Sequence, residues 1–102
     1  MIEVGNNGLE QIQNYKGFVM NGSDMSPAIN EGDHLVVDLA QKVIRSGEMY
    51  VVNYNKSMVV CRLLLDGQKV SLIFDGASHS FDEWINEITI IGRIIEVKTL
   101  TE

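Results

Sequence analysis

The chain has 102 residues, 45% of them hydrophobic, which is enough for one small domain with a core of its own. Its net charge of −6 argues against direct binding to nucleic acid, because the phosphates would be repelled. Every apolar run is much shorter than the length of about 20 residues that a membrane-spanning helix needs. Met1–Gly5 lacks a signal-peptide pattern, and a single cysteine excludes an internal disulfide, so we expect a reducing cytoplasm.

Residues 1–14 differ in composition from the rest of the chain. They are mostly polar, contain two glycines and show only a faint helical spacing of apolar residues. We interpret 1–14 as an arm or the end of an interdomain linker and 15–102 as the folded domain. A frayed terminus is the alternative interpretation of 1–14.

The remainder alternates short β-prone stretches with turn signals such as Ser46-Gly47 and Asp66-Gly67, and Asp-Gly is typical of two-residue hairpin turns. Gly92 lies inside the last apolar stretch and indicates a bulge. Short strands at regular spacing predict a mainly β domain with little helix. The predicted strands are Lys16–Met20, His34–Leu39, Glu48–Tyr54, Met58–Leu65, Lys69–Phe74 and Ile88–Val97, with a short helical turn at Phe81–Asn86.

Gly22-Ser23-Asp24-Met25-Ser26-Pro27 is the stretch around which the other elements are arranged. It holds the only proline of the chain, and its small polar residues exclude a helix or a central strand. Apolar, β-prone segments flank it on both sides, so we predict a tight loop between two core strands. Such loops often carry functional groups.

This loop resembles Gly-x-Ser-Met-x-Pro, the nucleophile loop of the LexA and phage-repressor self-cleaving peptidases and of signal peptidases. Further segments resemble the same family in the same order; they are Gly32-Asp33, Leu35–Asp38, Gly47–Val52, Val59–Leu63 and Ile90–Ile95. The resemblance covers about Lys16 to Val97. It implies a twisted antiparallel β domain of the LexA and signal-peptidase type.

The resemblance also locates the two catalytic positions of the family, a serine nucleophile and a lysine base. Asp24 stands at the serine position and Cys61 at the lysine position, so both catalytic groups are replaced. A carboxylate attacks an amide poorly, and losing one member of such a pair already costs several orders of magnitude in rate. The family cleaves itself at a small dipeptide, usually Ala-Gly, and this chain contains none. We therefore predict that the site has no catalytic residues.

Other residues could in principle supply the missing chemistry. Ser23 and Ser26 flank the nucleophile position, but the lysines at 42, 56 and 69 lie in other segments. Cys61 could form a thiol–imidazole pair with His34 or His79, although a cysteine in Val59-Val60-Cys61 is more simply a small buried hydrophobe. The histidines and the cysteine show no metal-ligand spacing, and no cofactor is expected.

The resemblance implies a dimerisation and oligomerisation domain of a bacteriophage or prophage repressor that does not cleave itself. DNA would be contacted only by a separate N-terminal helix-turn-helix domain, and the other partners would be further copies of the chain and an antirepressor protein, with no membrane. One alternative is a self-cleaving serine peptidase with a rearranged or inactivated site. A standalone interaction module is another.

The last predicted strand offers a candidate interface. Apolar residues occupy both of its faces, one with Ile88, Ile90 and Ile94 and the other with Ile91, Ile95 and Val97. A small domain covers one face, so a two-fold partner is expected to cover the other. The candidate interface residues are Ile91, Arg93, Ile95, Val97, Phe81 and Trp84. The alternative is that the segment Asp75–Trp84 folds over the second face or joins the core.

Overall fold

A computed structural model describes residues 14–77 and 80–99, and the predicted arm at 1–14 therefore lies almost wholly outside the described residues. Nearly all regular elements of the described residues are strands, which confirms the predicted mainly β fold. The elements are β1 (Tyr15–Val19), β2 (His34–Asp38), β3 (Met49–Tyr54), β4 (Ser57–Asp66), β5 (Lys69–Ile73), β6 (Ser80–Trp84), the 3-10 turn η1 (Ile85–Glu87) and β7 (Ile88–Lys98).

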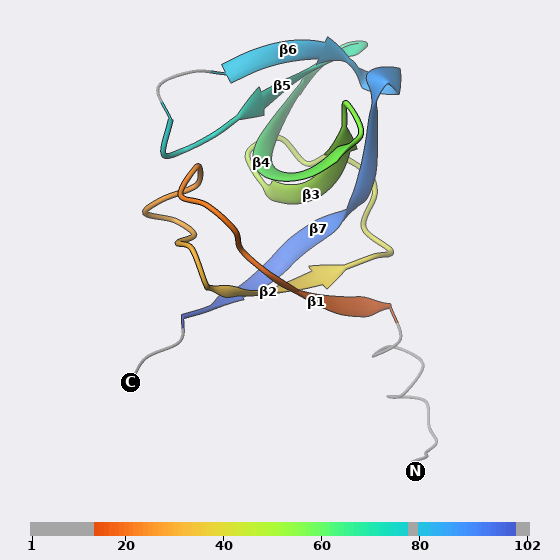
Figure 1. The fold of residues 1–102 in the computed structure, drawn as a ribbon. Coiled ribbons are helices and arrows are strands. Elements are labelled where there is room, and N and C mark those ends of the chain that lie inside the picture. Colours follow the sequence, from red (N-terminus) through yellow and green to blue (C-terminus); the bar gives the residue numbers. More distant parts are fainter. Residues whose placement is uncertain (1–13, 78–79, 100–102) are drawn as a thin grey trace, which may run out of the picture.

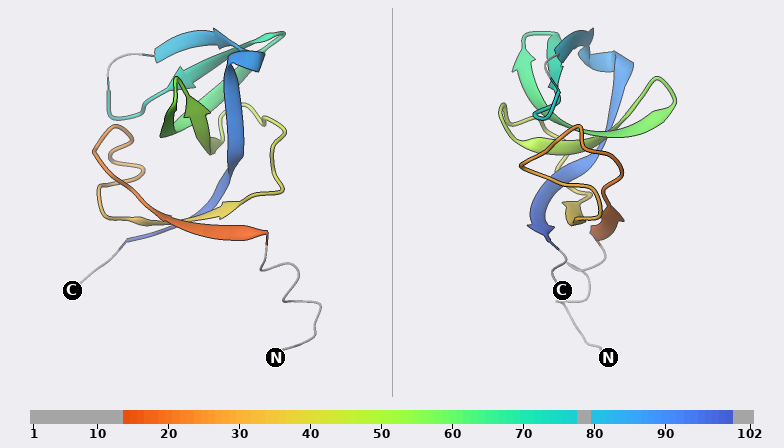
Figure 2. Two further views of the ribbon diagram at one scale, coloured as in Figure 1. Left: turned by 45° about the vertical axis from the view of Figure 1, so that its right-hand side comes forward. Right: turned by 60° about the vertical axis from the view of Figure 1, so that its left-hand side comes forward.

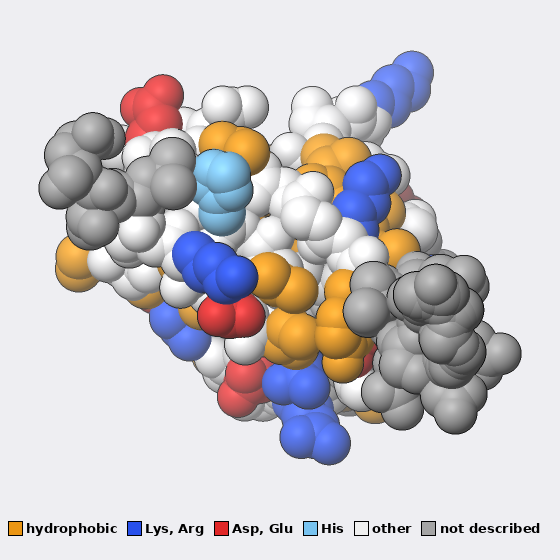
Figure 3. Space-filling view, turned by 90° about the horizontal axis from the view of Figure 1, so that it is seen from below, with side chains coloured by type: hydrophobic (Ala, Val, Ile, Leu, Met, Phe, Trp, Pro, Cys, Tyr) orange, Lys and Arg blue, Asp and Glu red, His pale blue; other side chains and the backbone are white. Residues whose placement is uncertain are grey.

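All strand pairs are antiparallel, and the seven strands form one sheet in the order β1-β2-β7-β3-β4-β5-β6. The sheet is strongly twisted. Strands β3 to β6 curl around one end of the molecule, and β1, β2 and the C-terminal part of β7 form a flatter layer at the other end (Figure 1). The outer face of this flatter layer shows hydrophobic side chains among charged ones (Figure 3).

Strand β7 joins the two parts of the sheet, since it pairs with β2 on one side and β3 on the other (Figure 2). Its register shifts twice, leaving Ile91 unpaired between partners of Val51 and Val52, and Ile95 unpaired between partners of Val36 and Val37. The bulge predicted at Gly92 is therefore present at the neighbouring residue. Because each bulge reverses the alternation of side chains, the two faces expected for Ile88–Val97 are not continuous along β7.

The core lies between the two parts of the twisted sheet and includes side chains from β2, β3, β4, β5 and β7. Tyr50 is the largest fully buried side chain. Its hydroxyl donates to the Val43 carbonyl at 3.1 Å and accepts from the Arg45 amide at 2.7 Å, so the buried polar atom is satisfied. These bonds also fix the connection that leads into β3.

The segment Phe81–Asn86 is the one element whose predicted type was wrong for most of its length. Residues 80–84 form strand β6, and only Ile85–Glu87 make a short 3-10 turn. Phe81 lies opposite Leu72 of β5, and its ring packs 5.4 Å from that of Tyr54 and 5.7 Å from that of Phe74. Pairing with β5 and this aromatic contact outweigh the weak helical pattern.

The close approach of β7 to β2 can be tested at Gly92. A Cβ at this position would lie 2.6 Å from the Asp38 carbonyl oxygen and 2.7 Å from Val37 Cγ1. We expect Gly92→Ala to lower the free energy of unfolding by about 1–3 kcal/mol through overpacking, measured by urea denaturation. The matched control is Gly17→Ala, where the nearest atom would be 3.9 Å away. Equal stability of the two variants would contradict the packing described for the sheet crossing.

Candidate functional site

The loop predicted from Gly22–Pro27 lies in the connection between β1 and β2. Met25 and Ile29 are completely buried and anchor it to the core, and burying side chains of this size contributes about 1.5–3 kcal/mol each. The Ile29 amide donates to the Met25 carbonyl at 2.9 Å, and the Ser26–Pro27 peptide bond is cis. With Met25 and Ile29 turned into the core, Ser23 and Asp24 are left exposed.

The turn after β5 packs directly against this loop. The Gly76 amide donates to the Asp24 carbonyl at 2.7 Å, and the Asp75 amide donates to Met25 Sδ at 3.4 Å. A Cβ on Gly76 would lie 2.5 Å from the Ser23 carbonyl oxygen, so only glycine allows the two backbones to come this close. Two segments 50 residues apart in sequence are thereby fixed to each other.

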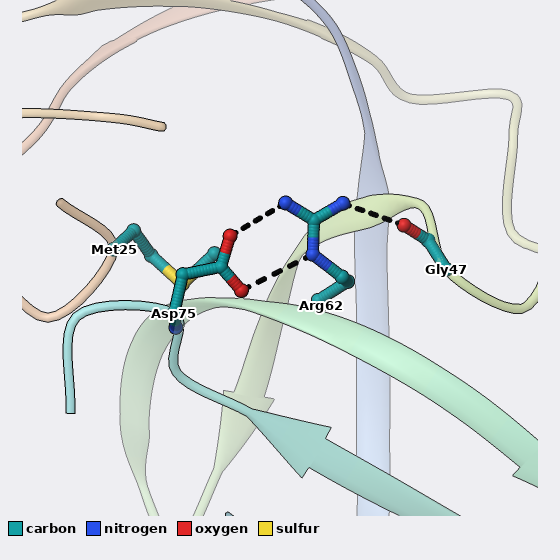
Figure 4. A network of polar contacts seen from close by, with 4 residues as sticks. All are labelled: Met25, Gly47, Arg62 and Asp75. Atoms are coloured by element: carbon teal, nitrogen blue, oxygen red, sulfur yellow. Dashed lines mark hydrogen bonds and ion pairs between the residues drawn. The ribbon is translucent and has the colours of Figure 1, made fainter. Parts of the chain in front are cut away.

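Arg62 of β4 holds this turn in place (Figure 4). Its guanidinium donates to both carboxylate oxygens of Asp75, at 3.2 Å and 2.6 Å, and to the Gly47 carbonyl at 2.7 Å. The hydrogen bond from Arg62 lowers the pKa of the Asp75 carboxyl, and the same bond raises the pKa of Arg62. Nothing in the sequence indicated this role of Arg62, because it depends on a tertiary contact between β4 and the turn after β5.

A groove of about 330 Å³ opens beside the loop, and Asp24 contributes to its lining. The groove is bordered by the end of β1 on one side and by β3 and β4 on the other. Its lining is mostly apolar; the residues are Phe18, Val19, Met20, Asn21, Asp24, Leu35, Val51, Met58, Val59, Val60 and Phe74. Asp24 is thus a carboxylate at the border of an apolar depression.

Cys61 follows Val60 on β4 but is not part of the groove lining. It lies opposite Tyr50 of β3, is completely buried, and burial raises the pKa of its thiol to about 12. A thiol with this pKa stays protonated near neutral pH, so it is neither a nucleophile nor a general base there. The prediction that Cys61 is a small buried hydrophobe is confirmed.

Among the described residues, the alternative catalytic groups are not brought together. Within the described part of the chain no lysine is hydrogen-bonded to Ser23 or Ser26; the Ser26 hydroxyl lies 2.7 Å from Asn30 Oδ1 instead. His34 is exposed at the start of β2, whereas Cys61 is enclosed in the core, and His79 lies outside the described residues. No three metal-ligating side chains converge in residues 14–77 and 80–99.

The six candidate interface residues occupy different surroundings. Phe81 packs between aromatic rings, and Ile91 and Val97 pack against the core. Arg93 lies 3.7 Å from Glu48, and its Nε is buried with no hydrogen-bond partner among the described residues. Ile95 and Trp84 are exposed at 41% and 55%, but β6 and the C-terminal part of β7 lie at opposite ends of the domain (Figure 1). Their part in an interface stays a prediction.

Comparison with known proteins agrees with this geometry. The loop, the turn that supports it and the strongly twisted antiparallel sheet define a domain with a peptidase-like fold. Residues 2–95 match the Peptidase S24-like family, and the chain belongs to that family. The resemblance to LexA-like and phage-repressor domains is thereby confirmed.

Two relatives illustrate where such domains occur. The chain is 31% identical over 85 residues to an uncharacterized HTH-type transcriptional regulator of Haemophilus influenzae, a match covering 78% of this chain and 36% of the relative. It is 32% identical over 81 residues to the 26 kDa repressor protein of Escherichia phage HK022, covering 79% of this chain and 33% of the relative. The chain thus spans about a third of the length of these relatives. None of the helices in the described residues is long and apolar enough to cross a membrane.

The buried thiol leads to a test of the site. We expect Cys61 of the folded chain to resist a disulfide reagent at pH 8, because the thiol is enclosed and its pKa is near 12. Labelling should follow unfolding in urea and be complete in the denatured chain, as measured by absorbance. Rapid stoichiometric labelling with the circular dichroism spectrum unchanged would contradict the burial of this residue.

The Arg62–Asp75 pair predicts a pH-dependent contribution to stability. Because the pKa of Asp75 is lowered on folding, its contribution is fully present above the unfolded pKa and is lost as the pH falls through the folded pKa. Asp75→Asn should therefore lower the free energy of unfolding by about 1 kcal/mol at pH 7, with a smaller difference in acid. Asp66→Asn, at the exposed end of β4, is the control. A difference for Asp75→Asn that does not shrink in acid would contradict the assigned contact.

Proposed function

We propose that this chain is a dimerisation and oligomerisation domain of a bacteriophage or prophage transcriptional repressor that does not cleave itself. The observation that carries the proposal is the state of the two catalytic positions. Asp24 is exposed at the nucleophile position of an otherwise well-packed loop, and Cys61 is buried at the base position. The loop is held by the buried Met25 and Ile29 and by the turn after β5, and these contacts do not involve the catalytic groups.

Peptide cleavage by this family needs a hydroxyl whose proton is taken by a neutral amine. The Asp24 carboxylate has no proton to give when ionised and is a poor nucleophile toward an amide. The Cys61 thiol, with a pKa of about 12, keeps its proton near neutral pH. Unlike a neutral lysine amine, it cannot take up the proton of a nucleophile. Neither half of the reaction is therefore supplied by the residues at these positions.

The regulatory role is inferred from the relatives, one named as a phage repressor and one as an HTH-type regulator. The acidic chain, with its net charge of −6, suits a domain that assembles the protein while another part contacts DNA. A dimer doubles the DNA contacts, and association of dimers raises operator occupancy through effective concentration. Induction would then require a binding partner such as an antirepressor protein rather than self-cleavage.

The alternative is a serine peptidase with a rearranged site, in which Ser23 or Ser26 replaces the usual nucleophile. Ser23 is exposed next to Asp24, which is the feature that favours this alternative. Against it stands the orientation of the loop, whose Ser23 carbonyl accepts from the Ser26 amide at 3.1 Å, with no lysine amine bonded to either serine in the described residues.

Self-cleavage is tested by incubating the chain at pH 10, where a lysine base would be partly neutral, and measuring its mass after denaturation. We expect the intact mass alone over a time in which a self-cleaving member of the family is cut completely. The variants Ser23→Ala and Ser26→Ala serve as matched controls. A specific cut that disappears in either variant would contradict the proposal and assign the nucleophile.

A further inference from the structure

Strand β1 ends the sheet, and within the described residues one of its two edges has no strand partner. The hydrogen bonds at both ends of the β1–β2 pair show which backbone groups face which edge. Leu39 donates to the Asn14 carbonyl at 2.7 Å, and Met20 donates to the Asp33 carbonyl at 2.9 Å. In an antiparallel ladder, backbone groups alternate between the two edges. Even-numbered residues therefore face β2, and the amides and carbonyls of Tyr15, Gly17 and Val19 face the free edge.

The same alternation divides the side chains between the two faces of β1. Lys16 and Phe18 lie opposite Val37 and Leu35, which are buried. Tyr15 and Val19, on the other face, are 44% and 57% exposed. Tyr15 and Val19 therefore combine free backbone groups with exposed apolar side chains, and Gly17, which has free backbone groups alone, lies between them.

The other end strand of the sheet is protected differently. Strand β6 carries Asp82 and Glu83 in its centre, and pairing it with a copy of itself would bring carboxylates together. Strand β1 carries one charge, Lys16, whose Nζ lies 5.5 Å above the centre of the Phe18 ring. Of the two end strands, β1 is the one whose edge is open to pairing.

We propose that β1 pairs with β1 of a second copy of this chain, antiparallel and about a two-fold axis at Gly17, so that two sheets become one. This inference rests on the proposed function and places its interface at β1 rather than at the six residues predicted from the sequence. Gly17 pairs with Gly17 of the second copy, and Tyr15 pairs with Val19 of the second copy on each side. These are the residues whose backbone groups face the free edge, so each pair exchanges both of its hydrogen bonds.

The side chains are complementary in this register. Tyr15 lies opposite Val19 of the second copy, an aromatic and β-branched pair of the kind that stabilises sheets. Lys16 lies opposite Phe18 of the second copy, which repeats between chains the cation–π contact within β1. A two-fold interface requires a self-complementary surface, and this five-residue strand provides one.

The charge distribution also favours pairing of two copies at this end of the domain. The layer of β1, β2 and the C-terminal part of β7 contains Lys16, Arg93 and Lys98 against Asp38 and Glu96, whereas the whole chain has a net charge of −6. Figure 3 shows basic, acidic and hydrophobic side chains intermixed on this face. This layer therefore does not carry the net negative charge of the chain, which reduces the repulsion between two copies that meet at β1.

Amide hydrogen exchange by NMR, measured on this chain at low and high micromolar concentration, tests the proposal directly. Lys16 and Phe18 should be protected at every concentration, because their amides donate to β2. The Tyr15, Gly17 and Val19 amides should exchange freely in the dilute sample and become protected in step with the dimer fraction found by sedimentation. Protection that does not depend on concentration would overturn the proposal.

Two variants of one residue provide the matched comparison. Gly17→Pro removes the central amide from both copies while leaving the bonds to β2, and proline is tolerated on such an edge. We expect it to raise the dimer dissociation constant at least about tenfold, whereas Gly17→Ala, which keeps the amide, changes it less than about threefold. Circular dichroism and the β2 amide shifts verify that both variants are folded.

The outcomes separate this inference from the proposed function. A dimer whose odd-numbered β1 amides exchange freely, or that survives Gly17→Pro, would place the interface elsewhere and leave the oligomerisation role intact. A chain that stays monomeric at high micromolar concentration would overturn both.

Discussion

The fork of hydrogen bonds between Arg62 and Asp75 is the contact on which the arrangement of the site depends. It holds the turn after β5 against the loop between β1 and β2, where the Gly76 amide and Met25 Sδ complete the connection. Because the third donor of Arg62 binds the Gly47 carbonyl, the same side chain also fixes the turn before β3. Three connections that are distant in sequence are thus positioned by one guanidinium, a role that suits its rigid geometry.

This arrangement is compatible with the proposed absence of self-cleavage. The loop is positioned by Met25 and Ile29, which are buried, and by backbone hydrogen bonds, none of which involves the Asp24 carboxylate. Cys61 occupies its position as a small apolar side chain between neighbouring core strands. A buried lysine would require a neutral amine at that place, whereas the cysteine is buried at little cost. This packing therefore does not depend on a serine at position 24 or a lysine at position 61.

Much of the fold could be predicted because local signals agreed with tertiary structure. The Asp66-Gly67 turn and the alternation around Leu35 and Val37 located strands to within one or two residues. Phe81–Asn86 could not be assigned correctly, since its strand depends on pairing with β5. The contact of Arg62 with Asp75 joins β4 to the turn after β5, and a single sequence carries no signal for it. Gly92 indicated one bulge of β7 to within one residue, whereas the second bulge, at Ile95, depends on the pairing with β2.

The two ends of the sheet relate the fold to assembly. Strand β6 carries two negative charges, Asp82 and Glu83, whereas β1 carries a single charge, that of Lys16. The loop Gly22–Pro27 and strand β1 are adjacent in the chain, since β1 ends at Val19 and the loop follows. Assembly through β1 would therefore restrain the segment that leads into the loop, without any contact at Asp24.

Native mass spectrometry of the chain after prolonged incubation at alkaline pH tests the central claim most directly, because it reports covalent integrity and assembly together. The account predicts uncut chains of 11.4 kDa that associate into dimers, with a dimer fraction that rises with protein concentration. Cleaved chains, or intact chains that remain monomeric throughout the concentration series, would contradict it.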